Sequence, residues 1–160
     1  MENLGKTEHT GFATTLNNLA GGVYVQKGRN ERALELYTRA LEIRERILGL
    51  DNPEVAKTLN NLGELYRIMG KHKKALPPLY TRALKIYEST LGPSHPDVGT
   101  TLNNLAGLHE SMGEYETAID LYEKALDIIE KEYGPEHPYF KITRNNLLGL
   151  YEKMERSWRS

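Results

Sequence analysis

Apolar residues recur along the chain with the period of an α-helix, at i, i+3, i+4 and i+7. The clearest of these apolar stripes lies near residue 105. A matching stripe lies 43 residues earlier in the chain, and a third lies in the helix predicted after the first one. The first stripe is Leu102, Leu105, Ala106 and His109, the earlier one is Leu59, Leu62, Gly63 and Tyr66, and the third is Ala118, Leu121, Tyr122, Ala125 and Ile129. These patterns predict pairs of amphipathic helices and no strands.

The same motifs return at nearly constant spacing. The segment TLNNLA or a variant of it begins at residues 15, 58, 101 and 143, which are 43, 43 and 42 residues apart. The segments ERALELYTRALEI, KKALPPLYTRALKI and ETAIDLYEKALDI follow in the same phase, and so do the connectors LGLDNP, LGPSHP and YGPEHP. Three motifs in register over the whole chain indicate an array of repeats rather than one irregular domain.

Glycine and proline mark where the predicted helices end. Gly28, Gly70 and Gly113 stand between the two helices of a unit, where a residue with positive φ is favoured. The Pro-containing connectors break the chain between units, because proline starts a helix well and does not continue one. We therefore expect seven helices, at about 10–27, 30–48, 53–69, 72–90, 96–112, 115–132 and 138–154.

The combination of LNNLA, Gly-x-Tyr, ALxI and LGPxHP resembles the tetratricopeptide repeat family, in its longer form of about 42 residues that is typical of kinesin light chains. The resemblance covers nearly all of the chain. It implies an all-α, right-handed superhelical solenoid of antiparallel helix pairs, about 3.5 repeats in length. We expect one repeat domain over 1–160, with units at about 10–49, 53–91 and 96–133 and a partial unit at 138–156.

The chain departs from this repeat in three places. One extra residue lies near Gly21 and Gly22, and another lies near Pro77 and Pro78. An inserted residue turns the following helix by about 100°, so each site should hold a π-bulge, a kink or a shifted boundary; at the prolines we expect a kink. The last unit stops after its first helix, so the apolar stripe there should be partly uncovered and could meet another molecule. That stripe comprises Leu147, Leu148 and Tyr151.

The resemblance implies that the first helices line a concave groove that binds peptide segments of partner proteins. The groove row contains one asparagine per unit, and polar or small residues accompany it. The candidate peptide-binding residues are Asn17, Asn60, Asn103, Asn145, Lys57, Glu64, Arg67, Thr100, Gly107 and Glu110. An asparagine amide can pair with a peptide N–H and C=O whatever the ligand side chain, and the glycine would leave room for a bulky one.

Two alternatives to these roles stay open. The groove asparagines could instead hydrogen-bond between adjacent repeats and stabilise their stacking, which is the role we favour for Asn18, Asn61, Asn104 and Asn146. Lys57 and Arg67 could meet an acidic ligand residue, or they could simply pair with Glu64 on the helix surface.

The amino-acid composition argues against several classes of function. The 21 Lys and Arg residues nearly balance 22 Asp and Glu, so a general electrostatic role on nucleic acid or on a membrane is not expected. Cysteine is absent, no signal peptide or membrane span is visible, and we expect a soluble, cytoplasmic protein. The five histidines lie in connectors or helix stripes that do not converge, so no metal site, no cofactor and no enzymatic activity are expected.

The sequence therefore predicts a non-catalytic scaffold that binds an extended peptide segment of a partner in its groove. The alternative is a self-assembly module that stacks or exchanges helices through the incomplete last repeat and forms homo-oligomers. A sensor of signalling peptides is a further possibility, which would require an effector domain.

Overall fold

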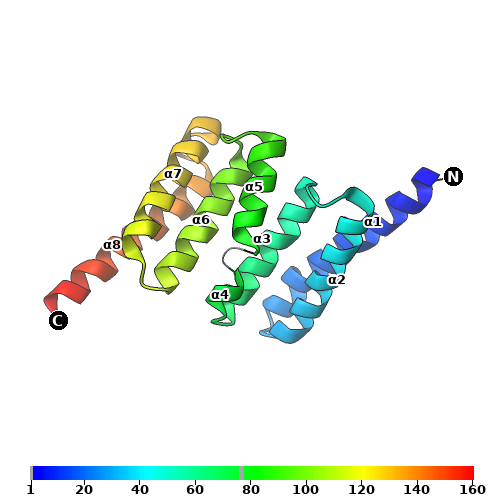
Figure 1. The fold of residues 1–160 in the computed structure, drawn as a ribbon. Coiled ribbons are helices and arrows are strands. Elements are labelled where there is room, and N and C mark those ends of the chain that lie inside the picture. The colour runs from blue at the N-terminus through cyan, green and yellow to red at the C-terminus, as the bar shows by residue number, and fades with distance from the viewer. Residues whose placement is uncertain (1, 76–77) are drawn as a thin grey trace. The chain divides into compact units, whose positions relative to one another are not determined.

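The computed structural model describes residues 2–75 and 78–160, and every regular element in these ranges is a helix (Figure 1). The elements are α1 (Glu2–Leu19), the π-helix η1 (Ala20–Val25), α2 (Asn30–Leu48), α3 (Pro53–Ile68), α4 (His72–Ala75), α5 (Tyr80–Leu91), α6 (Pro96–Ser111), α7 (Tyr115–Tyr133) and α8 (Pro138–Arg159). The first helices of the successive repeats are thus α1 with η1, α3, α6 and α8. The second helices are α2, α4 with α5, and α7.

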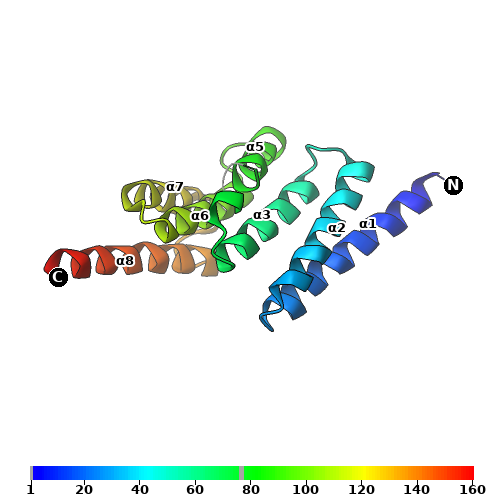
Figure 2. The ribbon, with the colours of Figure 1, turned by 60° about the horizontal axis from the view of Figure 1, so that its bottom comes forward.

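The chain forms two compact units, residues 1–86 and 87–160, and the boundary falls within α5. In the first unit α1 packs against α2, and α2 packs against α3; Figure 2 shows these three helices side by side. In the second unit α6 packs against α7, and α7 packs against α8. Each unit therefore contains the helix-pair packing that the repeat predicts.

Helix starts in the connectors are fixed by a side-chain cap followed by proline. Asn52 accepts a hydrogen bond from the Glu54 N–H at 2.9 Å, and Nδ1 of His95 accepts one from the Asp97 N–H at 3.1 Å. His137 caps α8 in the same way, through the Tyr139 N–H at 3.2 Å. Each cap satisfies a backbone donor that the first helical turn leaves unpaired, and the proline that follows needs no such partner.

The two ends of the chain are more helical than expected. Helix α1 begins at Glu2 rather than near residue 10, because Thr10 stands where the other units have the proline that starts a new helix. Helix α8 continues to Arg159 rather than ending near residue 154, because no glycine or proline follows Gly149 to end it. The interhelical glycines Gly28, Gly70 and Gly113 have φ of 67°, 72° and 78°, as predicted.

The extra residue near Gly21 and Gly22 is accommodated by the π-helix η1, one of the three outcomes expected. A π-turn holds one more residue than an α-turn, so the residues on either side keep their faces despite the insertion. The helix expected over 72–90 comprises α4 and α5, with a turn at Pro78 and Leu79. Leu76 and Pro77 lie outside the described residues, and the predicted kink falls there.

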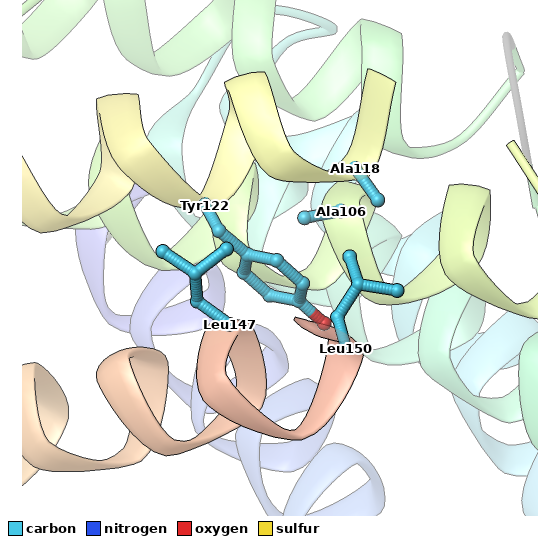
Figure 3. Packing of buried hydrophobic residues seen from close by; sticks show 5 residues of the cluster. All are labelled: Ala106, Ala118, Tyr122, Leu147 and Leu150. Atoms are coloured by element: carbon cyan, nitrogen blue, oxygen red, sulfur yellow. The ribbon is translucent and has the colours of Figure 1, made fainter. Parts of the chain in front are cut away.

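The core of the second unit forms around Tyr122 of α7. Its ring packs with Ala106, Ala118, Leu147 and Leu150, which come from α6, α7 and α8 (Figure 3). All five are buried, and Ala106, Ala118 and Leu150 are fully inaccessible. Small residues on α6 and α7 let the two backbones approach, and the tyrosine ring fills the space toward α8.

Candidate functional site

The expected groove row of the second unit lies on one side of α6 and stays partly accessible. Thr100, Asn103, Gly107 and Glu110 are all half-buried. The Thr100 hydroxyl donates to the Pro96 carbonyl one turn earlier, at 3.2 Å. This row therefore presents one hydroxyl, one amide and one carboxylate along a single helix face.

Asparagines hydrogen-bond between neighbouring first helices in both units. In the first unit Asn61 Nδ2 donates to Asn17 Oδ1 at 3.1 Å, and in the second Asn146 Nδ2 donates to Asn103 Oδ1 at 3.0 Å. The second asparagine of one repeat thus holds the first asparagine of the repeat before it. These contacts are of the inter-repeat kind that the sequence left open. Asn103 Nδ2 in turn donates to the Asn104 Oδ1 at 3.4 Å.

The groove asparagines differ in accessibility although they hold the same repeat position. Asn17 is 4% exposed and Asn60 is 9% exposed, so both are buried in the first unit. Asn103 is half-buried and Asn145 on α8 is exposed. Only the asparagines of the second unit are therefore accessible enough to contact a ligand without rearrangement.

The charged members of the row in the first unit are largely engaged with each other. Arg67 holds the Glu64 carboxylate through two bonds, Nε to Oε2 at 2.9 Å and Nη2 to Oε1 at 2.6 Å. This is the surface pairing that the sequence offered as one alternative for Arg67. Lys57 is exposed one helical turn before Asn60.

The repeated tyrosine of the second helices donates to a carboxylate on the groove row. Tyr80 donates to Glu64 Oε2 at 3.3 Å, and Tyr122 donates to Glu110 Oε2 at 3.1 Å. Burial, and secondarily the charge of Glu64, raise the pKa of the Tyr80 phenol far above its ordinary value. Because Glu64 and Glu110 fall at different repeat positions, this shared role could not be deduced from the alignment of the units.

Glycine on the row leaves open space in the second unit. A Cβ atom at Gly107 would lie 3.5 Å from the Tyr122 hydroxyl, which is an ordinary contact, and one at Gly149 on α8 would meet nothing within 4 Å. On the same side of the unit, Lys153 Nζ lies 3.7 Å from Glu110 Oε1 and 5.5 Å from the centre of the Tyr115 ring. The accessible face of α6 and α8 thus combines amides, free space and a charge pair.

A buried arginine that the sequence analysis did not single out ties the first unit together. Arg44 of α2 is 1% exposed, and its guanidinium donates to the Thr58 hydroxyl at 2.6 Å, the Glu54 carbonyl at 3.1 Å and the Thr14 hydroxyl at 3.2 Å. It also pairs with the Glu54 carboxylate at 2.9 Å. These bonds join α1, α2 and α3, and the signal in the sequence is a charged residue within an otherwise apolar helix stripe.

Three of the five histidines serve local structure. His95 and His137 cap helices, and His137 also stacks on the Tyr133 ring at 4.2 Å between centroids. His109 on the stripe of α6 is half-buried and bonds through Nδ1 to the Glu114 carboxylate. Across residues 2–75 and 78–160, no three histidine or acidic side chains gather in a way that could hold a metal ion.

The chain belongs to the tetratricopeptide repeat family, whose sequence model matches residues 11–79, 78–131 and 98–160. Among solved structures, it is similar to BtubC (BKLC) from P. vanneervenii, with 27% identity and a TM-score of 0.76, over 88% of this chain and 55% of that one. It is also similar to a putative kinesin light chain with nearly identical repeats from Podospora anserina, with 25% identity and a TM-score of 0.77, over 86% of this chain and 64% of that one.

These likenesses confirm the predicted fold class and the kinesin-light-chain-like type of the repeat. The Sgt2 tetratricopeptide domain from Aspergillus fumigatus shares the fold at 21% identity, with a TM-score of 0.60 over 92% of this chain and 82% of that one. The chain spans between half and two thirds of the length of the first two structures. No curated protein matches the sequence. None of the described helices combines the length and the apolar character needed to cross a bilayer.

Proposed function

We propose that this chain is a non-catalytic scaffold that binds an extended peptide segment of a partner protein along the accessible face of α6 and α8. Repeats of this family generally mediate protein–protein interaction, which supports the proposal. The absence of enzymatic activity and the cytoplasmic location remain predictions from the sequence. The ten residues named as peptide-binding remain candidates, and those that are accessible to solvent are better candidates than those that are buried.

The observation that carries this proposal is the difference between the two units. Asn103 and Asn145 are accessible, whereas Asn17 and Asn60 are buried. Because Asn146 occupies the Asn103 oxygen and Asn103 Nδ2 donates one hydrogen to the Asn104 oxygen, the group that Asn103 can offer a ligand is its second Nδ2 hydrogen, which can bind a peptide carbonyl. Asn145 can offer both its donor and its acceptor atoms. Gly107 and Gly149 leave space for ligand side chains beside these amides.

The test uses a peptide array screened with the whole chain, followed by titration of the peptides that bind. Asn103→Asp combined with Asn145→Ala should weaken the binding of those peptides at least about tenfold. Aspartate at 103 keeps an oxygen for Asn146 and removes the amide donor, so the contact with Asn146 survives and only the long bond to Asn104 is lost with the ligand-facing donor. Asn18→Ala, at an exposed asparagine of α1, is the matched control. Unchanged affinity in the double variant, with an unchanged circular dichroism spectrum, would contradict the groove model.

Exposed apolar side chains on α8 favour self-association as a second candidate function. Ile142, Leu148 and Tyr151 are 52%, 51% and 39% exposed, and Trp158 is 80% exposed. A second copy that covers them would remove this apolar area from water. Light scattering over a range of concentrations should then show a dimer that Leu148→Glu dissociates. A monomer at every concentration excludes this function.

A further inference from the structure

The outer side of the α1–α2 pair carries a hollow of about 550 Å³ that the peptide-binding proposal does not use. Its lining contains two arginines, one carboxylate and one large exposed ring. The residues are His9, Phe12, Arg39, Glu42, Ile43 and Arg46. Phe12 is 44% exposed, which is unusual for an aromatic residue on the packing side of a helix.

The repeat shows what the same positions do 43 residues later. The hexapeptide LYTRAL occurs at 36–41 and again at 79–84, so Arg39 of α2 corresponds to Arg82 of α5. By the same register Phe12 of α1 corresponds to Val55 of α3. The first unit therefore contains two copies of one surface, in two different environments.

At the later position the surface is occupied by the end of a helix. Arg82 Nη1 donates to Glu45 Oε1 at 2.6 Å, and Arg82 Nη2 donates to the Leu50 carbonyl at 3.0 Å. Glu45 lies in the last turn of α2, and Leu50 lies in the connector that follows it. Val55 is fully buried, whereas Phe12 is not. The arginine thus binds a carboxylate of the last helical turn together with a backbone carbonyl of the connector that follows it.

At the earlier position the arginine has no such partner. The Arg39 guanidinium lies 5.4 Å from the centre of the Phe12 ring. Within the part of the chain that the structure describes, no carboxylate or carbonyl pairs with it. The Arg39 side chain, with its guanidinium N–H donors, is exposed next to the Phe12 ring and a second cation, Arg46.

We propose that this hollow is a docking site for the C-terminal end of an amphipathic helix of a partner protein that carries a carboxylate in its last turn. Arg39 donates hydrogen bonds to a carboxylate in the last turn of that helix and to a backbone carbonyl of the chain segment that follows the helix. Phe12 and Ile43 take an apolar side chain of the same turn. Arg46 adds a second positive charge and Glu42 a negative one, so the lining keeps a net positive charge, which favours the partly negative C-terminal end of a helix.

A second copy of this chain does not fit this site as it stands. Each second helix here is followed by a first helix, so that α3 packs against α2 and α8 packs against α7. Glu130 of α7 is exposed and corresponds to Glu45 in the repeat. However, α8 packs against α7 as α3 packs against α2, so it already covers the side of α7 that α1 of a second copy would have to contact. A helix end from another protein carries no such obstruction.

The probe for this site is a synthetic peptide of residues 30–52, which reproduces α2 and its connector, held helical by a side-chain staple on its exposed face and labelled for fluorescence anisotropy. Titration with the full chain should give saturable binding. Arg39→Glu in the chain should weaken it at least about tenfold, and Glu45→Arg in the peptide should do the same. The two changes together should restore most of the affinity. Arg32→Glu, at an exposed arginine of α2 that pairs with Glu35, is the control and should leave binding unchanged.

Three results would overturn the proposal. The first is the absence of saturable binding by the folded chain. The second is binding that Arg39→Glu does not weaken, or an affinity that the combined Arg39→Glu and Glu45→Arg changes do not restore. Either result would mean that the peptide binds to a different surface of the chain. The third is a dimer in light scattering that Arg39→Glu dissociates, which would assign the hollow to a second copy. Because Arg39 is exposed, the variant should keep the circular dichroism spectrum of the wild type.

Discussion

At the scale of single residues, the side chains packed around a glycine decide what its replacement does to stability. Gly63 and Gly107 are both glycines on the first helices, yet they differ in what surrounds them. A Cβ at Gly63 would lie 2.7 Å from Cζ and 2.8 Å from Cε1 of the buried Tyr80 ring, whereas one at Gly107 would have only the Tyr122 hydroxyl at 3.5 Å. Packing requires the first glycine, whereas the second has room for a Cβ atom.

This contrast gives a paired prediction. Gly63→Ala should lower the free energy of unfolding by about 1–3 kcal/mol, because the overpacked ring outweighs the better helix propensity of alanine. Gly107→Ala should raise it by about 0.5–1 kcal/mol, because propensity acts there without a clash. Urea unfolding followed by circular dichroism measures both. Equal effects of the two substitutions would show that the Tyr80 contact does not restrict residue 63.

The buried phenol of Tyr80 predicts how stability depends on pH. Burial raises its pKa in the folded chain, whereas tyrosine in the unfolded chain ionises near pH 10. Above that pH the unfolded state binds fewer protons than the folded state, so the stability present below pH 10 is lost as the pH rises. Urea unfolding from pH 8 to 11 should show this decline, and Tyr80→Phe should make it shallower. The same slope in both proteins would exclude Tyr80 as the cause.

At the scale of helices, the extra residue in the first repeat and its π-helix belong together. Without η1, residues after Gly22 would turn by about 100° relative to Leu16 and Ala20, and one of the two groups would leave the core. The sequence alone allowed a π-bulge, a kink or a shifted boundary here. The choice among them depends on α2, which packs against both α1 and η1 and requires both faces to be kept.

Deleting Gly22 should therefore be tolerated. Gly22 is exposed and has open space around it, and its loss gives the first helix the same distance from the TLNN segment to the interhelical glycine as in the next two repeats, so an α-helix can replace η1. We expect helical content to be kept and the free energy of unfolding to change by less than about 1 kcal/mol. Deleting Gly107 from α6, where no π-turn absorbs the change, should rotate the stripe and lower the free energy of unfolding by about 3 kcal/mol or more. Thermal unfolding that shows similar losses for both deletions would contradict this account.

At the scale of the whole molecule, a repeat array is stabilised by contacts between neighbouring helices, so each end has a face that the interior helices do not. Helix α8 covers Tyr122 and Ala106 with Leu147 and Leu150, while its last turns carry the exposed Trp158. The two parts of this one helix should therefore contribute very differently to stability.

Two truncations test this difference. A chain that ends at Ser157 should unfold at the same urea concentration as the full chain, because it loses only exposed residues. A chain that ends at Gly134 loses Leu147 and Leu150 from the core and should be less stable by about 3–6 kcal/mol, at about 1.5–3 kcal/mol for each buried leucine. A loss below about 1 kcal/mol in the shorter chain would mean that α8 is not part of the core of the second unit.

Local signals along the chain were enough to predict the repeat, its family, the helix pairs and the places where the pattern is interrupted. It could do so because helix periodicity, glycine with positive φ and proline at a helix start act within a few residues of the chain. It also supplied the candidate groove residues, since equal repeat positions fall on equal helix faces. It predicted both ends of the helical array less well, because α1 and α8 extend where no local stop signal exists.

Which of those candidates remain accessible to a ligand depends on the packing of neighbouring helices, which the sequence does not show. Asn17 and Asn145 hold the same repeat position, yet Asn17 is 4% exposed and bonded to Asn61, whereas Asn145 is exposed. Arg39 and Arg82 stand in the same hexapeptide, yet only Arg82 reaches a carboxylate and a carbonyl. The physical reason is that periodicity fixes the direction of a side chain on its own helix, while the neighbouring helices fix its solvent access and its partners.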